Sequence, residues 1–322
     1  REATQPGEIT QSPSMSTNLK IPSILIAALI TASVSATAKE KAPPVYPTDV
    51  RVEPDTAFLA DGRKEKADLY FPLERDAGVK SAAVIVIHGG GFNDGDKARR
   101  REINLAGHLA RNGYVAMSIN YKLRKMKNQV TWPQSLHDAK TSVRWLRKNA
   151  DHLGIDPERI AVIGCSAGGN LAAMLATTGP ADGLEPDGPY GEFPTHVRCA
   201  VNFYGAVDLM NYHDMKMFAK TREEAPELYR KASPITYVDA KDAPMLIVHG
   251  TADETVPFSQ SETLVAALKS AGVEHQFLVV PDGPHTFCLE SEKLDLRPQV
   301  FAFLEKHLGV TPAFRSKGSP AE

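Results

Sequence analysis

A serine set between glycines is the residue of this chain best suited to nucleophilic chemistry. Residues 159–173 run from a short apolar stretch through a G-x-S-x-G pattern, with Ser166 between Gly164 and Gly168, into an alanine-rich stretch. This order is typical of a nucleophile elbow, a strand-to-helix turn so sharp that larger neighbours would clash. The turn would place the N–H of Ala167 at a helix N-terminus, where unpaired amides stabilise a developing oxyanion. The alternative is a structural turn with an inert serine, because the pattern alone is common.

The base and the acid are expected downstream of the serine. A serine hydroxyl is a weak nucleophile until a histidine removes its proton and a carboxylate orients that histidine. With this kind of elbow the acid comes next along the chain and then the histidine, each after a later strand. Six of the ten histidines follow Ser166. Of these, His285 lies in a loop, residues 281–287, between the last predicted strand and the last predicted helix. We therefore predict His285 as the base, in preference to His249, which ends a predicted strand.

Asp253 is the predicted acid. It is the first carboxylate after the apolar run 244–249, within the segment HGTADETVP at 249–257. Glu254 is adjacent and would point elsewhere. Asp208, which follows the preceding predicted strand, is the alternative acid.

A glycine run supplies the second part of an oxyanion hole. The segment HGGGF at 88–92 directly follows the apolar run 82–87. Glycines let the backbone turn its amides toward a substrate oxygen, and loss of one such donor costs about 3 kcal/mol of transition-state stabilisation. We predict that Gly90, Gly91 and Ala167 donate these N–H groups. The alternative is a flexible glycine turn.

The elements that would position these residues alternate between strand and helix. A predicted hairpin, residues 56–59 and 66–72, precedes an apolar run of strand length at 82–87. Further strands are predicted at 114–121, 160–163, 200–204, 244–249 and 275–280. Pieces between them, such as 134–153 and 258–271, carry apolar residues at helical spacing. The alternation predicts a doubly wound, mainly parallel α/β sheet with helices on both faces. Its site is expected where the strands end.

Two segments interrupt this alternation. Residues 179–195 are rich in Gly, Pro and Asp, and residues 208–231 are a mixed helical stretch with several methionines. Either segment could overhang the site as a small cap or form an excursion on the surface.

Composition fits one catalytic domain, predicted at residues 56–310. The chain has 322 residues, is 42% hydrophobic and has a net charge of −2, with no basic footprint for nucleic acid. The basic run at 97–101 is interpreted as the solvated start of a helix. Three cysteines are too few for a disulfide framework, and their spacing does not match a zinc site, so we expect the thiols to be buried. Neither a metal ion nor a cofactor is expected.

The N-terminal region predicts export. Residues 1–14 are taken as upstream of the fold. Residues 15–38 have the pattern of a signal peptide, with Lys20, an apolar run at 21–30 and an A-x-A cleavage site ending at Ala38. The run is too short for a membrane span, so release into the periplasm or the medium is expected, with an uncleaved anchor as the alternative. Residues 39–55 are interpreted as a linker and residues 311–322 as a tail.

Over residues 56–308 the motifs together resemble an α/β-hydrolase of the esterase/lipase group. The chain is similar to the hormone-sensitive-lipase-like and the bacterial feruloyl/acetylxylan-esterase-like (BD-FAE-like) branches in HGGGF, in GCSAGGNLA at 164–172, in HGTADETVP and in PHTF at 284–287. The resemblance implies ester hydrolysis through an acyl-enzyme, with Ser166 as nucleophile, His285 as base and then acid, and Asp253 as the orienting acid. The segment before the first predicted strand is too short for a large cap, so an open site with at most a small cap is expected.

An open site in an exported enzyme favours a short acyl or aromatic ester on a bulky alcohol. The expected partner is a small-molecule or polysaccharide-linked ester, such as an acetyl or feruloyl ester; the oligomeric state stays open. An amidase or arylformamidase would use the same triad. A peptidase of the prolyl-oligopeptidase kind would carry a large extra domain. A hydrolase-like binding protein would be expected to lack a triad residue.

Overall fold

The computed structural model describes residues 42–75, 78–287, 289–290 and 294–309. Every described helix and strand belongs to the unit that begins at Pro44. The predicted signal peptide, the residues before it and the predicted tail lie outside the described residues, as does Cys288. Cys165 and Cys199 are buried and are not joined in a disulfide.

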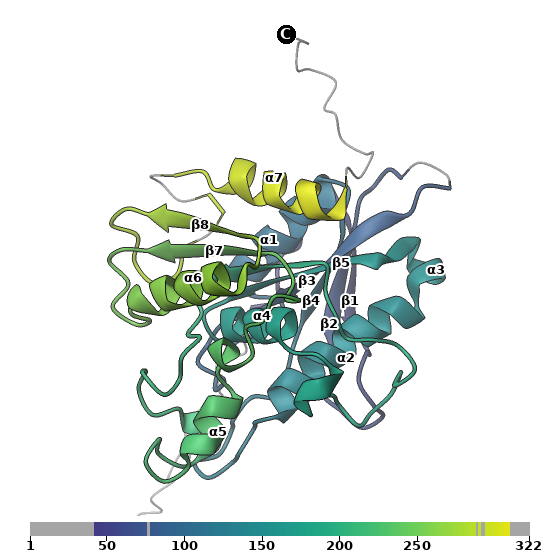
Figure 1. Cartoon of the computed structure of the whole chain (residues 1–322). Helices are drawn as coiled ribbons and strands as arrows, with labels where there is room; N and C mark the ends of the chain where they lie inside the picture. Colours follow the sequence, from purple (N-terminus) through teal and green to yellow (C-terminus); the bar gives the residue numbers. More distant parts are fainter. Residues whose placement is uncertain (1–41, 76–77, 288, 291–293, 310–322) are drawn as a thin grey trace, which may run out of the picture. The chain divides into compact units, whose positions relative to one another are not determined.

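In the described part of the chain, eight strands form one sheet with the order β1-β2-β4-β3-β5-β6-β7-β8 (Figure 1). The strands are β1 (Arg51–Thr56), β2 (Ala67–Phe71), β3 (Ser81–Ile87), β4 (Val115–Ile119), β5 (Ile155–Cys165), β6 (Cys199–Phe203), β7 (Met245–Gly250) and β8 (His275–Val280). The β1–β2 and β2–β4 pairs are antiparallel, and every pair from β4 to β8 is parallel. The predicted mainly parallel sheet is thus confirmed.

Helices cover both faces of this sheet. One face carries α1 (Arg100–Arg111) and α7 (Arg297–Leu308), and the other carries α2 (Gln134–Lys148), α4 (Ala167–Thr177) and α6 (Ser259–Ala271) (Figure 1). Two shorter helices, α3 (Ala150–Leu153) and α5 (Pro226–Lys231), lie in the connections. This arrangement confirms the prediction of a doubly wound sheet.

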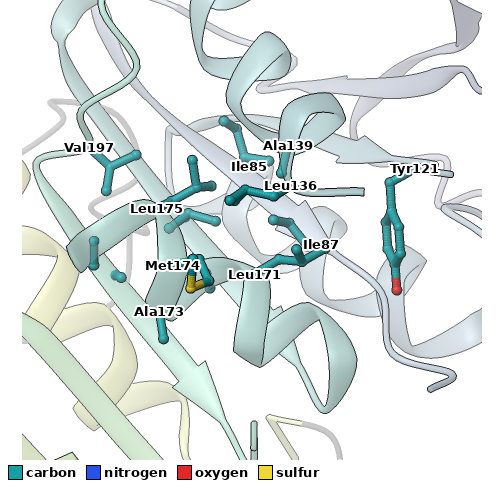
Figure 2. Close-up of a cluster of buried hydrophobic side chains, with 14 of the residues drawn as sticks. Ile85, Ile87, Tyr121, Leu136, Ala139, Leu171, Ala173, Met174, Leu175 and Val197 are labelled. Atoms are coloured by element: carbon teal, nitrogen blue, oxygen red, sulfur yellow. The ribbon is translucent and has the colours of Figure 1, made fainter. Parts of the chain in front are cut away.

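The central strand β3 shows why these segments form a two-sided core. Its side chains alternate, so that Ile85 and Ile87 join one buried cluster while Val84 and Val86 join the other. A strand covered on both faces is apolar at nearly every position, as β3 is. Figure 2 shows Ile85 and Ile87 among side chains of α2 and α4.

Helix α4 carries the elbow serine's C-terminal neighbours into this core. All eleven residues of α4 are buried, and alanine and glycine make up more than half of them, so that the helix approaches the sheet closely. Leu171 and Leu175 lie between α2 and the sheet in Figure 2. Burial of each such side chain contributes about 1.5–3 kcal/mol. The core therefore holds this helix, and with it the preceding turn, in one place.

The structure corrects three predictions. The first strand, predicted at 56–59, is β1 and occupies Arg51–Thr56, all but its last residue within the predicted linker; Pro54 is tolerated there because β1 is at the sheet edge. The helical stretch 134–153 is divided into α2 and α3 at Asn149. The basic run 97–101 is not simply solvated, because Lys97 is buried with its Nζ 2.6 Å from Oδ1 of the buried Asp68.

Candidate active site

Ser166 occupies a strained turn between β5 and α4. Its φ and ψ of 56° and −117° lie in a region that residues with a side chain rarely adopt, at a cost of about 1–3 kcal/mol. Its N–H donates to the carbonyl oxygen of Phe203 at 2.8 Å. A Cβ on Gly164 would lie 1.9 Å from the carbonyl oxygen of Gly168, and a Cβ on Gly168 would lie 2.1 Å from that of Ile87. The G-x-S-x-G pattern is thus a steric requirement of this turn.

The structure brings Ser166, His285 and Asp253 into one hydrogen-bonded row. His285 Nε2 is 3.0 Å from Ser166 Oγ, and His285 Nδ1 is 2.7 Å from Asp253 Oδ2. Because the carboxylate accepts, Nδ1 carries the hydrogen, and Nε2 is free to accept the serine O–H. This is the arrangement in which an imidazole can remove the proton of an attacking hydroxyl.

The loop after β7 surrounds the Asp253 carboxylate with donors. Oδ1 accepts the backbone N–H groups of Thr255 and Val256, both at 2.8 Å. Oδ2 accepts from His285 and also from Nε2 of His249, which is 3.1 Å away. The carboxyl group is fully buried, and a buried charge requires such partners. The sequence alone assigned no role to His249.

Asp208, the alternative acid, has other partners. It accepts the backbone N–H of Met210 and of Asn211, both at 3.2 Å, and the side-chain amide of Asn211 at 2.7 Å. Asp208 therefore stabilises its own turn, while Asp253 contacts the histidine.

Tyr204 is a second residue that sequence reasoning missed. Its ring is fully buried and packs edge-on against that of His285, with the centroids 4.8 Å apart. Its hydroxyl donates to the carbonyl oxygen of Phe287 at 3.3 Å and accepts from Arg101 Nη1 at 3.3 Å. Burial raises the pKa of Tyr204 well above its usual value, so the phenol stays neutral. Tyr204 thus supports the loop that carries His285.

The glycine loop lies directly on the elbow. A Cβ on Gly89 would be 2.8 Å from the carbonyl oxygen of Cys165. Gly90 has a φ of +116° and Gly91 a φ of +58°, and the loop closes through N–H groups of Asn93 and Asp94 that donate to the carbonyl of Gly90. Only glycine accommodates the first of these positions, where a Cβ would be 1.9 Å from the Asp94 carbonyl oxygen.

One cavity of about 450 Å³ contains the reacting groups. Ser166 and His285 line it together with all three predicted oxyanion donors, Gly90, Gly91 and Ala167. Within the described residues no backbone hydrogen bond from these three amides is found outside regular helix and strand pairing. That these amides donate to a substrate oxygen stays a prediction.

Of the two interrupting segments, one lies at this cavity. Leu209, Tyr212 and Met215 from segment 208–231 line its wall, and the Tyr212 hydroxyl donates to the carbonyl of Thr255 at 2.8 Å. This segment is the small cap that the sequence left undecided.

Segment 179–195 lies elsewhere. Its Glu185 binds Lys140 and Arg144 of α2, and residues 179–182 line a larger hollow of about 990 Å³. That hollow is lined by none of Ser166, Asp253 and His285, whereas the smaller cavity is lined by the hydrogen-bonded Ser166 and His285.

In the described ranges, no group of three or more His, Cys, Asp or Glu side chains is arranged to hold a metal ion. Over the same residues, no helix is long and apolar enough to span a membrane.

The chain is similar to known esterases in sequence and structure. The BD-FAE family model matches residues 67–268. Esterase LipQ of Mycobacterium tuberculosis is 30% identical over 246 residues, which are 73% of this chain and 57% of LipQ. The ethyl acetate hydrolase of Pseudomonas putida is 30% identical over 238 residues, 70% of this chain and 72% of that protein.

A truncated form of a carbohydrate esterase from gut microbiota has a similar solved structure. It superposes with a TM-score of 0.73 at 26% identity, and the match covers 82% of this chain and 99% of that one. The chain spans only a little over half the length of LipQ. The matches confirm the resemblance that the motifs indicated.

Proposed function

Because the chain belongs to the BD-FAE family and has the α/β-hydrolase fold, we propose that it is a carboxylic ester hydrolase acting through an acyl-enzyme on Ser166. The observation that carries this proposal is the continuous path from Ser166 Oγ to His285 Nε2, 3.0 Å, and from His285 Nδ1 to Asp253 Oδ2, 2.7 Å. The serine end of this path lies at the wall of a cavity that a substrate can fill.

Each group has a defined task in the proposed reaction. Ser166 Oγ attacks the acyl carbon as His285 Nε2 takes its proton, and Asp253 stabilises the imidazolium that forms. The carbonyl oxygen gains negative charge and accepts hydrogen bonds from the N–H groups of Gly90, Gly91 and Ala167. His285 then returns the proton to the leaving alkoxide, which departs as the alcohol.

Deacylation repeats these steps with water. His285 takes a proton from a water molecule that attacks the acyl-serine carbon, and it then gives the proton to Ser166 Oγ as the acid leaves. The enzyme returns to its starting state without a cofactor in this scheme.

The proposed substrates are short-acyl or aromatic esters, including acetyl or feruloyl esters on polysaccharides. Relatives named as an ethyl acetate hydrolase and a carbohydrate esterase support this choice. The small cap and the 450 Å³ cavity suit a short acyl group with a larger alcohol reaching outward. Export to the periplasm or the medium, with cleavage near Ala38, is part of the proposal and is supported by the residue pattern at 15–38.

The test is hydrolysis of p-nitrophenyl esters from acetate to octanoate, together with methyl ferulate and acetylated xylan, by the wild type and Ser166→Ala. We expect the wild type to cleave the short esters, and the variant to fold normally but lose roughly 10⁴-fold or more in kcat. Turnover retained by Ser166→Ala would contradict the nucleophile assignment. Cleavage of formanilides but of no ester would favour an amidase, and binding without any turnover would favour a hydrolase-like binding protein.

A further inference from the structure

His249 is a second histidine in contact with the carboxylate of the triad. It lies near the end of β7, is fully buried, and has its Nε2 3.1 Å from Asp253 Oδ2. That oxygen is the one that His285 Nδ1 contacts at 2.7 Å. The other ring nitrogen of His249, Nδ1, is 2.6 Å from Ser261 Oγ in α6. The ring therefore connects the triad acid to the helix behind it.

The neighbours of the His249 ring decide which nitrogen carries the hydrogen. Nε2 faces two acceptors, Asp253 Oδ2 and the carbonyl oxygen of Val256 at 3.0 Å, so it must donate. Nδ1 can then accept the rotatable hydroxyl of Ser261. Burial lowers the pKa of His249, which favours the neutral ring with hydrogen on Nε2.

We propose that His249 is a positioning residue of the triad, whose neutral imidazole donates to Asp253 Oδ2 and so controls the direction and strength of the Asp253–His285 contact. Its kinetic consequences rest on the proposed esterase function. Its hydrogen-bonding role does not, because it follows from the contacts of the ring alone.

Removing the donor has two separable effects. Without it, the carboxylate loses one of the contacts that hold Oδ2 toward His285, so the maximal rate falls. The negative charge of the Asp253 carboxylate is also less compensated, so it stabilises the protonated form of His285 more strongly. The acid limb of the pH–rate profile therefore moves to higher pH. If His249 merely filled space, replacing it would lower the rate without moving this limb.

Other charges do not complicate this expectation in the described structure. The titratable side chains that act on His249 are Asp253, from the loop after β7, and His285, from the loop after β8. Helix α6 and the residue before it present Ser261 and Phe258, both uncharged.

The kinetic test compares His249→Leu with His249→Gln. A glutamine Nε2 is as many bonds from Cβ as the histidine Nε2, so it can donate to Asp253 Oδ2, whereas leucine cannot donate. We would measure kcat/KM for p-nitrophenyl acetate from about pH 5 to pH 9. His249→Leu should lose about ten- to hundredfold, the value of one hydrogen bond to a charged group, with its acid limb at higher pH. His249→Gln should stay within about threefold of the wild type, with an unmoved limb.

Either of two results would overturn the proposal: a wild-type profile for His249→Leu, or an equal loss for both variants with the acid limb unmoved. The wild type itself provides a readout that needs neither turnover nor a variant, namely ¹⁵N–¹H NMR of the histidine rings. Hydrogen on Nε2 of a neutral His249 is expected, and hydrogen on Nδ1 or a charged ring would overturn the proposal. A wild type that cleaves no ester would contradict the proposed function, and the NMR result would still decide the role of His249.

Discussion

Because His88, beside the glycine loop, is buried, we expect the folded protein to lose stability in acid. Its ring is fully buried and stacks on Tyr121 with the centroids 4.4 Å apart. Burial lowers the pKa of His88 from 6.5 to about 4. In the unfolded chain the same side chain titrates near its ordinary value of about 6.5. Between these two pH values the unfolded chain binds a proton that the folded protein does not.

The sign and the size of the effect follow directly. Because the unfolded state binds more protons, the free energy of unfolding falls as the pH falls through 6.5, and this loss levels off below about pH 4. One pH unit of separation corresponds to about 1.4 kcal/mol. The gap from 6.5 to about 4 therefore represents about 3 kcal/mol that is present at pH 7 and absent in acid.

Urea unfolding at pH 7 and at about pH 4.5, for the wild type and His88→Asn, measures this contribution. Asparagine does not titrate, and its amide can donate to the carbonyl of Gly89, which His88 Nδ1 contacts at 2.7 Å. The other histidines are common to both proteins, so their effects cancel in the comparison. We expect the wild type to lose about 2 kcal/mol more than the variant over this range. Equal losses would refute the conclusion that a neutral, buried His88 links folding to pH.

Two further predictions follow from steric and electrostatic contacts. Gly168→Ala would place a Cβ 2.1 Å from the carbonyl oxygen of Ile87, so the elbow must shift; we expect a lower melting temperature and at least about a hundredfold loss of kcat, measured by calorimetry and ester hydrolysis. Lys97→Met would leave the buried Asp68 carboxylate without its closest cation and should cost about 3–5 kcal/mol in urea unfolding. The matched control, Lys80→Met at an exposed ion pair, should leave the free energy of unfolding nearly unchanged, and an equal effect of the two changes would contradict the assignment.

The strands and the order of the site could be predicted because both depend on local pattern. A strand buried on both faces is a continuous apolar run, so the predicted run 82–87 differs from β3 by one residue. The strand predicted at 275–280 coincides with β8, although β8 lies at the sheet edge and is only partly buried. Asp253 follows the strand predicted at 244–249, and His285 follows that predicted at 275–280. Because neighbouring parallel strands end at the same edge, the loops after β7 and β8 meet there.

Other features were missed because their partners are remote in the sequence. Strand β1 alternates poorly and contains Pro54, so only its pairing with β2 identifies it as an edge strand. Lys97 lies in a basic run that has the composition of a solvated helix start. Its burial depends on Asp68, a residue of β2 that no spacing rule connects to it.

The same distinction separates the elbow glycines, which the sequence reveals, from the residues that support the Ser–His–Asp row, which it does not. Gly164 and Gly168 are visible in the sequence because close backbone approaches at the turn demand them, and the strain at Ser166 is offset by the burial of α4 that follows it. His249 and Tyr204 act across strands. In the register of the sheet, Phe203 of β6 pairs with Val248 of β7, which places Tyr204, the residue after β6, beside the strand end that carries His249. A single sequence contains no such register, so the residues that hold a catalytic acid and base in place emerge only when the strands are paired.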